Sequence, residues 1–161
     1  MRESCVARRL TAGVRCFSNL RLMHNHRAII QAFYEVIWNK HDTSKIAELL
    51  QADCTFRGSL GHEQHGREGF AAYVDFVHAA LGDYRCEIQE VIAEGNKAFA
   101  RMWFSGRHRG EFFGYPPTGK RVEWAGAAVF TFTGEQIAAL WVLGDVHGLL
   151  QQLARNALPC A

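Results

Sequence analysis

The residue types best suited to moving a proton gather near the end of the chain. Asp145 ends an apolar run, residues 136–145, that also contains Trp141. Apolar walls raise the pKa of a carboxyl group because they disfavour its charged form, and such a group can give and take a proton near neutral pH. Alternation along a strand puts Trp141 and Asp145 on one face. The spacing predicts a catalytic Asp145 beside an aromatic wall, although Asp is also a favoured cap for the helix expected directly after it.

Two further polar side chains could assist this carboxyl group. His108 titrates in the range that suits proton transfer, but its ring could instead hold the following loop by hydrogen bonding. Arg101 shares a strand face with Trp103 and could neutralise an enolate or a substrate carboxylate, but a buried ion pair is equally open to it. Large apolar side chains favour a ligand cavity. Those that we expect to bind substrate, together with Arg101, are Tyr34, Trp38, Phe56, Trp103, Trp124 and Trp141.

The sequence offers no convincing metal or cofactor site. His62 and His65 lie in a Gly-containing loop, residues 59–66, and no third ligand lies at a useful spacing. The prolines of the GYPPTG string remove amide donors that a phosphate-binding loop would need. We therefore expect no metal and no cofactor.

Composition favours one domain with a substantial core. The chain has 161 residues, of which 48% are hydrophobic. A net charge of +2 gives no field that would favour nucleic acid or a membrane surface, and no window approaches the roughly 20 apolar residues of a membrane span. We therefore expect neither nucleic acid nor a membrane as a partner.

The first 22 residues differ from the rest in composition. They carry five Arg and one Glu among Ser, Thr and Cys, which is typical of a mitochondrial transit peptide. An over-extended start is the alternative, because translation from Met23 would leave the predicted domain, residues 23–161, intact. We expect disorder over residues 1–22 in both cases. The scattered cysteines otherwise indicate a reducing compartment, and hence the cytoplasm.

The period of the hydrophobic pattern changes along the chain from about 3.6 residues, typical of a helix, to 2 residues, typical of a strand. Helical patterns come first and strands follow, which predicts an α+β fold with helices on one side of an antiparallel sheet. The first helix should form a lid over something hydrophobic. The expected helices are residues 25–38, 42–50 and 67–81 and a short one after 145; the expected strands are 54–56, 84–93, 97–107, 122–132 and 136–145.

Several strings resemble the SnoaL-like polyketide cyclase and ester cyclase family of the NTF2-like superfamily. The specific one is GRHRGEFFGYPPTGKRVEW, followed by W-x-x-x-D at 141–145 and GLLQQL at 148–153. FYEVIWNKHD and ADCTF, near the start, are similar to that family as well. The likeness covers about residues 25–153.

This resemblance implies an NTF2-like cone, in which a curved antiparallel sheet wraps around helices and encloses a deep apolar pocket, usually in a homodimer. It implies an acid/base carboxylate on the last strand, at Asp145. A histidine on the preceding strand assists in characterised cyclases, and the matching position here is Thr131. Ketosteroid isomerase, which is similar in fold, tunes its carboxyl groups in the manner described above.

The resemblance favours a cyclase or isomerase that transfers protons without a cofactor on a small hydrophobic carbonyl compound. A ligand-binding or dimerising module remains an alternative, since one fold serves many functions. The other alternative is an epoxide hydrolase, which needs two carboxylates flanking an arginine. Phe99 and Trp103 lie beside Arg101 instead, which counts against that alternative.

Overall fold

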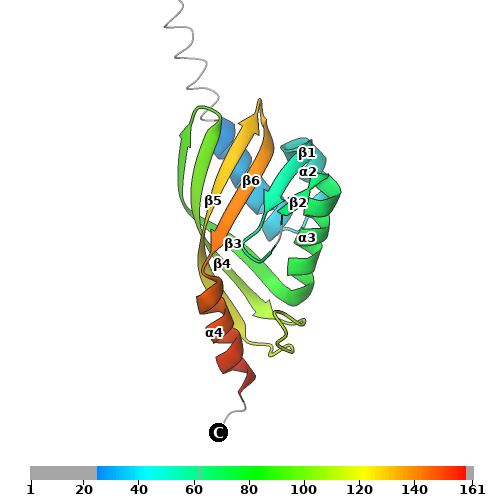
Figure 1. Ribbon diagram of the computed structural model, residues 1–161, viewed down its shortest axis with the longest axis vertical. Coiled ribbons are helices and arrows are strands. Elements are labelled where there is room, and N and C mark those ends of the chain that lie inside the picture. Colours follow the sequence, from blue (N-terminus) through cyan, green and yellow to red (C-terminus); the bar gives the residue numbers. More distant parts are fainter. Residues whose placement is uncertain (1–24, 62, 159–161) are drawn as a thin grey trace, which may run out of the picture.

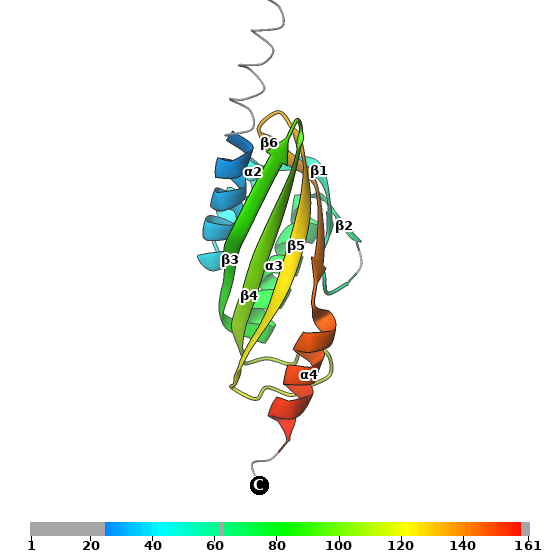
Figure 2. The same ribbon diagram turned by 90° about the vertical axis from the view of Figure 1, so that its left-hand side faces the viewer.

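A curved six-stranded sheet forms one side of the molecule in the computed structural model, which describes residues 25–61 and 63–158 (Figure 1). The strand order is β2-β1-β6-β5-β4-β3. The helices at residues 25–39 and 66–80 lie against the concave side, so the predicted α+β cone is confirmed (Figure 2). The strands are β1 (Leu50–Arg57), β2 (Glu63–His65), β3 (Leu81–Glu94), β4 (Lys97–His108), β5 (Arg121–Thr133) and β6 (Gln136–Gly144).

One strand pair departs from the expected antiparallel pattern. β1 runs parallel to β6, with Phe56 opposite Leu140, so the sheet is mixed. β1 is also longer than the predicted strand, because Leu50, predicted to be helical, already pairs with Ile137. β2, which sequence analysis placed in a loop, pairs antiparallel with β1.

The helices follow the predicted order. Residues 25–32 are helical and continue into a wider π-helical segment, η1 (Phe33–Asn39). The turn η2 (Thr43–Lys45) is capped by the Asp42 carboxylate and leads into α2 (Ile46–Leu49). α3 (Gly66–Ala80) crosses the concave face, and α4 (Val146–Ala157) follows β6. No helix among the described residues is both long and apolar enough to span a bilayer.

Side-chain alternation on the long strands divides the core from the outer surface. Along β4, Met102 and Phe104 point inward and are buried, whereas Arg101 and Trp103 point outward. Trp103 is 41% exposed, so the outer face of this strand is partly open to solvent. The inner face alone belongs to the core.

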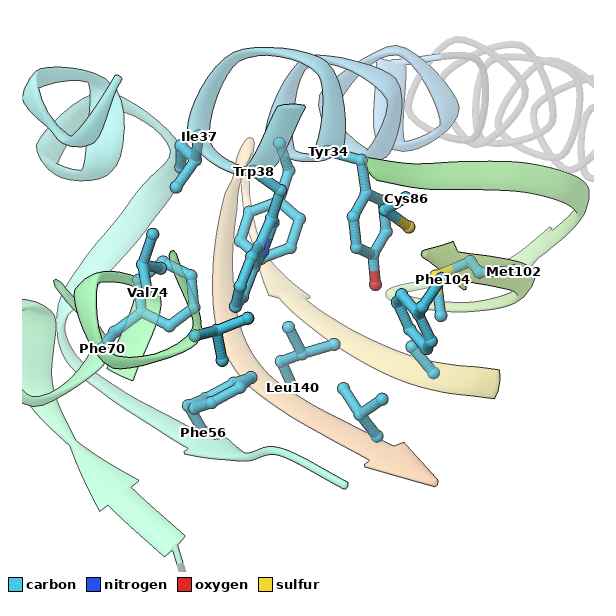
Figure 3. Packing of buried hydrophobic residues seen from close by; sticks show 14 of the residues in the cluster. Tyr34, Ile37, Trp38, Phe56, Phe70, Val74, Cys86, Met102, Phe104 and Leu140 are labelled. Carbon is cyan, nitrogen blue, oxygen red and sulfur yellow. The ribbon is translucent and has the colours of Figure 1, made fainter. Parts of the chain in front are cut away.

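The first helix closes the concave side as the predicted lid. Tyr34 and Trp38 extend from η1 toward the sheet, where they meet Phe56 of β1 and Phe104 of β4 (Figure 3). Phe70 of α3 packs against Trp38, with ring centroids 6.0 Å apart. Burying each such side chain contributes about 1.5–3 kcal/mol, so this aromatic layer is a main source of stability.

Gly126, on the inner face of β5, makes room for the Phe104 ring. A Cβ there would collide with that ring. We predict that Gly126→Ala lowers the free energy of unfolding by about 1–3 kcal/mol, the usual cost of overpacking. Gly61→Ala is the control, because a Cβ at Gly61 meets nothing within 4 Å. Urea denaturation of both variants measures the difference, and equal stabilities would contradict this packing.

Candidate functional site

An aromatic cavity lies between the first helix, α3 and the inner face of the sheet. Its volume is about 30 Å³, and no charged side chain lines it. The aromatic rings around it come from six different elements. They are Phe33, Tyr34, Trp38, Phe56, Tyr73, Tyr84, Phe104 and Trp124.

The structure brings together four of the residues that the sequence nominated for substrate binding. Tyr34, Trp38, Phe56 and Trp124 all line the cavity, and their binding role stays a prediction. Tyr73 lines the cavity as well, but it was not nominated from the sequence. It belongs to the hydrophobic periodicity of the helix predicted at residues 67–81. That periodicity could have identified it, since this helix packs across the concave side.

Polar groups in the cavity wall are hydrogen-bond donors without charge. The indole Nε1 atoms of Trp38 and Trp124 are buried and have no partner among the described residues. Burial raises the pKa values of Tyr34 and Tyr84, so both phenols keep their protons at neutral pH. An apolar molecule with an oxygen acceptor would satisfy such donors, because an unpaired buried N–H group costs free energy.

Asp145 lies outside this cavity, at the start of α4. Its Oδ1 accepts a hydrogen bond from the Gly148 backbone N–H (2.9 Å), and the side chain is exposed. The predicted dry aromatic surroundings of this carboxyl group are therefore wrong, and the capping role that the sequence left open is present. The cause is the orientation of β6. The face of β6 that carries Trp141 points outward, and Trp141 is 44% exposed. A catalytic role for Asp145 stays a prediction.

A second, more polar hollow of about 440 Å³ adjoins Asp145 between β5 and α4. Trp124 contributes to the lining of both this hollow and the aromatic cavity. Gln152 fixes α4 to β5, because its amide donates to the Glu123 carbonyl (2.6 Å) and accepts from the Glu123 N–H (3.0 Å). Asp145 is thus held next to a residue of the cavity wall. Arg155 and the outward-facing Trp103 complete the hollow.

His108 is fully buried but does not line the cavity. Its Nδ1 lies 3.2 Å from the Thr118 hydroxyl, and its backbone N–H donates to Lys120. Burial lowers the pKa of His108, so the ring is neutral at pH 7. These contacts hold the PPTG loop, which is the structural role that the sequence left open. Its nomination as a catalytic residue stays a prediction.

Arg101 faces outward on β4 and lies 3.4 Å from the Glu90 carboxylate. Both side chains are about half exposed, so the ion pair that the sequence allowed is present but not buried. Thr131 also lies away from the cavity lining, whereas its neighbours Phe130 and Phe132 are buried in the core.

His65, the loop histidine that the structure describes, belongs to no metal site in the described part of the chain. His65 is exposed and lies 3.5 Å from Glu63, and His62 is outside the described residues. No cluster of three or more His, Cys, Asp or Glu residues able to hold a metal ion occurs within residues 25–61 and 63–158.

Comparison with known proteins places this geometry in a family. A family model described as SnoaL-like polyketide cyclase matches residues 28–153. The chain belongs to this family. The resemblance noted from its motifs is thereby confirmed. The curved sheet described above is thus that of a SnoaL-like polyketide cyclase domain.

Individual relatives are similar to the SnoaL-like domain over most of its length. The aklanonic acid methyl ester cyclase DnrD of Streptomyces peucetius is 32% identical over 104 residues, which are 62% of this chain and 64% of DnrD. The solved structure of TsrD from Streptomyces laurentii is 27% identical with a TM-score of 0.73, covering 84% of this chain and 97% of TsrD. IdmH from Streptomyces antibioticus is 26% identical with a TM-score of 0.71, covering 80% and 98%. The match spans less than two thirds of DnrD.

The capping role of Asp145 can be separated from its charge by substitution. Asp145→Ala should lower the free energy of unfolding by about 1 kcal/mol, because the Gly148 N–H loses its acceptor. Asp145→Asn should keep nearly full stability, since Asn caps helices as well as Asp does. Denaturant unfolding of the two variants checks this, and equal losses of stability in both would contradict the capping assignment.

Proposed function

We propose that this chain is a cyclase or isomerase that transfers protons without a cofactor, in an intramolecular aldol type of reaction, on a small hydrophobic carbonyl compound. The observation that carries the proposal is the uncharged aromatic cavity with two unpartnered indole N–H donors. Membership of the SnoaL-like polyketide cyclase family supports it, as does the name of DnrD, an aklanonic acid methyl ester cyclase.

The reaction makes three demands on the site. An α-proton must be removed, the resulting enolate must be stabilised, and the receiving carbonyl must be protonated. Indole and phenol donors in an apolar cavity suit the second demand, because a hydrogen bond to a developing oxyanion is strong where water is excluded. We assign the proton transfers to Asp145. Since Asp145 adjoins the hollow beyond Trp124, the reacting end of the substrate must extend past that indole.

A non-catalytic binding module is the second candidate. The observation that favours it is the exposed, capping position of Asp145, together with a cavity that contains no charged side chain. The epoxide hydrolase alternative draws no support from Arg101, which lies on the outer face of the sheet beside Glu90.

The Asp145→Asn variant distinguishes a catalytic protein from a non-catalytic binding module. With aklanonic acid methyl ester as the test substrate, we expect the variant to lose about 10²–10⁴-fold in kcat, the usual contribution of a positioned acid/base group. Substrate affinity, measured by quenching of tryptophan fluorescence, should be retained. The isomeric product can be followed by chromatography, because an intramolecular aldol closure leaves the mass unchanged.

Asp53→Asn is the matched control, since Asp53 is an exposed carboxylate on β1 and should leave turnover unchanged. Undiminished turnover in Asp145→Asn would overturn the role of Asp145. Binding of the ester by the unsubstituted protein with no turnover would favour the binding module instead.

We further propose that the chain forms a homodimer through the outer face of the sheet. Exposed large apolar side chains on the described part of this face are Ile92 (55%), Trp103 (41%), Val129 (37%), Trp141 (44%) and Leu143 (54%). Val129 and Trp141 are direct cross-strand neighbours, so the surface is contiguous, and such patches mark interaction sites. A second copy is the occupant that fits, because a two-fold axis lets the same face cover itself. The patch lies on the side of the sheet opposite the aromatic cavity, and its member Trp103 also lines the hollow beside Asp145, so a second copy would border that hollow and leave the aromatic cavity uncovered.

Leu143→Glu should convert the dimer to a monomer, because a charge would be buried without a partner at the centre of the interface. Sedimentation velocity over a range of concentrations measures the change. Leu158→Glu is the control, since Leu158 is 67% exposed but lies beyond the end of α4. A monomeric unsubstituted protein, or a dimer that survives Leu143→Glu, would contradict the proposal.

A further inference from the structure

The aromatic cavity is too small for the ligand that its chemistry suits. Its volume of about 30 Å³ accommodates about one or two water molecules. Sites that bind small organic molecules measure about 300–1,000 Å³. Part of the wall must therefore move before an aromatic carbonyl compound can enter.

Only a small part of the wall reaches the surface. Most lining side chains are buried, and the sheet strands behind them are held by continuous backbone hydrogen bonds. Ser59, Leu60 and Tyr73 are the lining residues of the loop after β1 and of α3 that remain partly exposed. Movement there disrupts no strand pairing.

An outer groove of about 310 Å³ lies directly beyond these residues. Leu60 and Tyr73 line both the groove and the cavity. The groove is otherwise bounded by residues of the loop and of α3, including Phe76, which is 52% exposed. None of the described side chains that line it is charged.

The Tyr73 ring stands between the two spaces. Toward the cavity it contacts Phe56 and Trp38, with ring centroids 4.9 and 6.1 Å away. Toward the groove it faces Phe76, with centroids 6.4 Å apart. The tip of the ring lies over Gly58, where a Cβ would collide with it. The ring position thus depends on a glycine in a loop, while the groove side is open.

We propose that Tyr73 is the gate of the ligand site: its ring swings toward Phe76, joins the cavity to the groove, and admits an uncharged aromatic or alicyclic carbonyl compound. The groove then holds the part of the ligand that the cavity has no room for. This inference rests on the proposed function, in that the cavity is taken to be the ligand site. It adds the route of entry and the residue that controls it.

A gate residue has a kinetic signature that a simple wall residue lacks. We would measure binding of prodan, a fluorescent aromatic ketone, by stopped-flow energy transfer from the tryptophans, with thermal unfolding recorded for each variant. Tyr73→Ala should raise the association rate constant about tenfold, because binding no longer waits for the ring to move. The dissociation rate constant should rise as well, so that Kd changes less than either rate.

Two further variants keep the test decisive. Gly58→Ala should also raise both rates, because the added methyl group displaces the Tyr73 ring toward the groove; this result stands even where Tyr73→Ala does not fold. Tyr115→Ala is the control, since Tyr115 is a partly buried tyrosine outside both linings, and it should leave both rates unchanged.

Unchanged association rates in both folded gate variants, or a rise in the dissociation rate alone, would overturn the gate. The proposed reaction would survive that result, because Asp145→Asn tests it separately. Failure of prodan to bind the unsubstituted protein would remove the cavity as the ligand site, and the gate with it.

Discussion

The alternation of side chains on a strongly curved sheet is the constraint on which the other features depend. Each long strand places every second residue on the concave side, and on β4 and β5 those positions carry Met102, Phe104, Trp124 and Phe130. Helical side chains from η1 and α3 fill the remaining space. Charge cannot be accommodated there without a partner, so the carboxylate, lysine and arginine side chains of the long strands lie at strand ends and on the outer face, whereas the buried ionisable groups are neutral ones such as the Tyr34 and Tyr84 phenols. This separation produces a cavity that can bind an apolar carbonyl compound, with the nearest carboxylates outside it.

Most of the fold could be predicted because the hydrophobic period is clear over long segments. The change from 3.6 to 2 after the α3 segment located both the helices and the hairpins, and the turns at Gly95 and Gly134 have the positive φ angles that favour glycine. The parallel pairing of β1 with β6 could not be predicted. That contact joins segments more than 80 residues apart, and nothing in the local pattern specifies it.

The site was harder to predict because large apolar residues occupy both faces of the same strands. Trp103 and Trp141 alternate with buried residues just as core residues would, yet they point outward. Alternation identifies which residues share a face, but it does not tell which face is concave. Because of the same ambiguity, the sequence predicted Asp145 in a dry cavity, whereas in the structure its carboxylate caps α4. Trp124 does line the cavity, and its neighbours along β5 are the polar Glu123 and the small Ala125, a contrast that marks its side of the strand as the buried one.

The interior thus combines a rigid and a movable part. Strand pairing fixes Trp124 and Phe104, while Tyr73 is held by ring contacts, by the closeness of Gly58 and by a hydrogen bond between its hydroxyl and the Leu60 backbone. Ring contacts of this kind contribute about 0.5–1.5 kcal/mol each, which an entering ligand can replace with contacts of its own. A tightly packed cavity wall and ligand entry are therefore compatible.

A crystal structure of the chain with bound prodan tests the central claim most directly, namely that the aromatic cavity inside the sheet is the ligand site. We expect the naphthalene ring of prodan to lie between Trp38 and Trp124, with the ketone oxygen within hydrogen-bond distance of an indole N–H. We expect Tyr73 to be displaced toward Phe76. Prodan bound only on the outer face of the sheet or beside α4, with the cavity closed and Tyr73 unmoved, would contradict it.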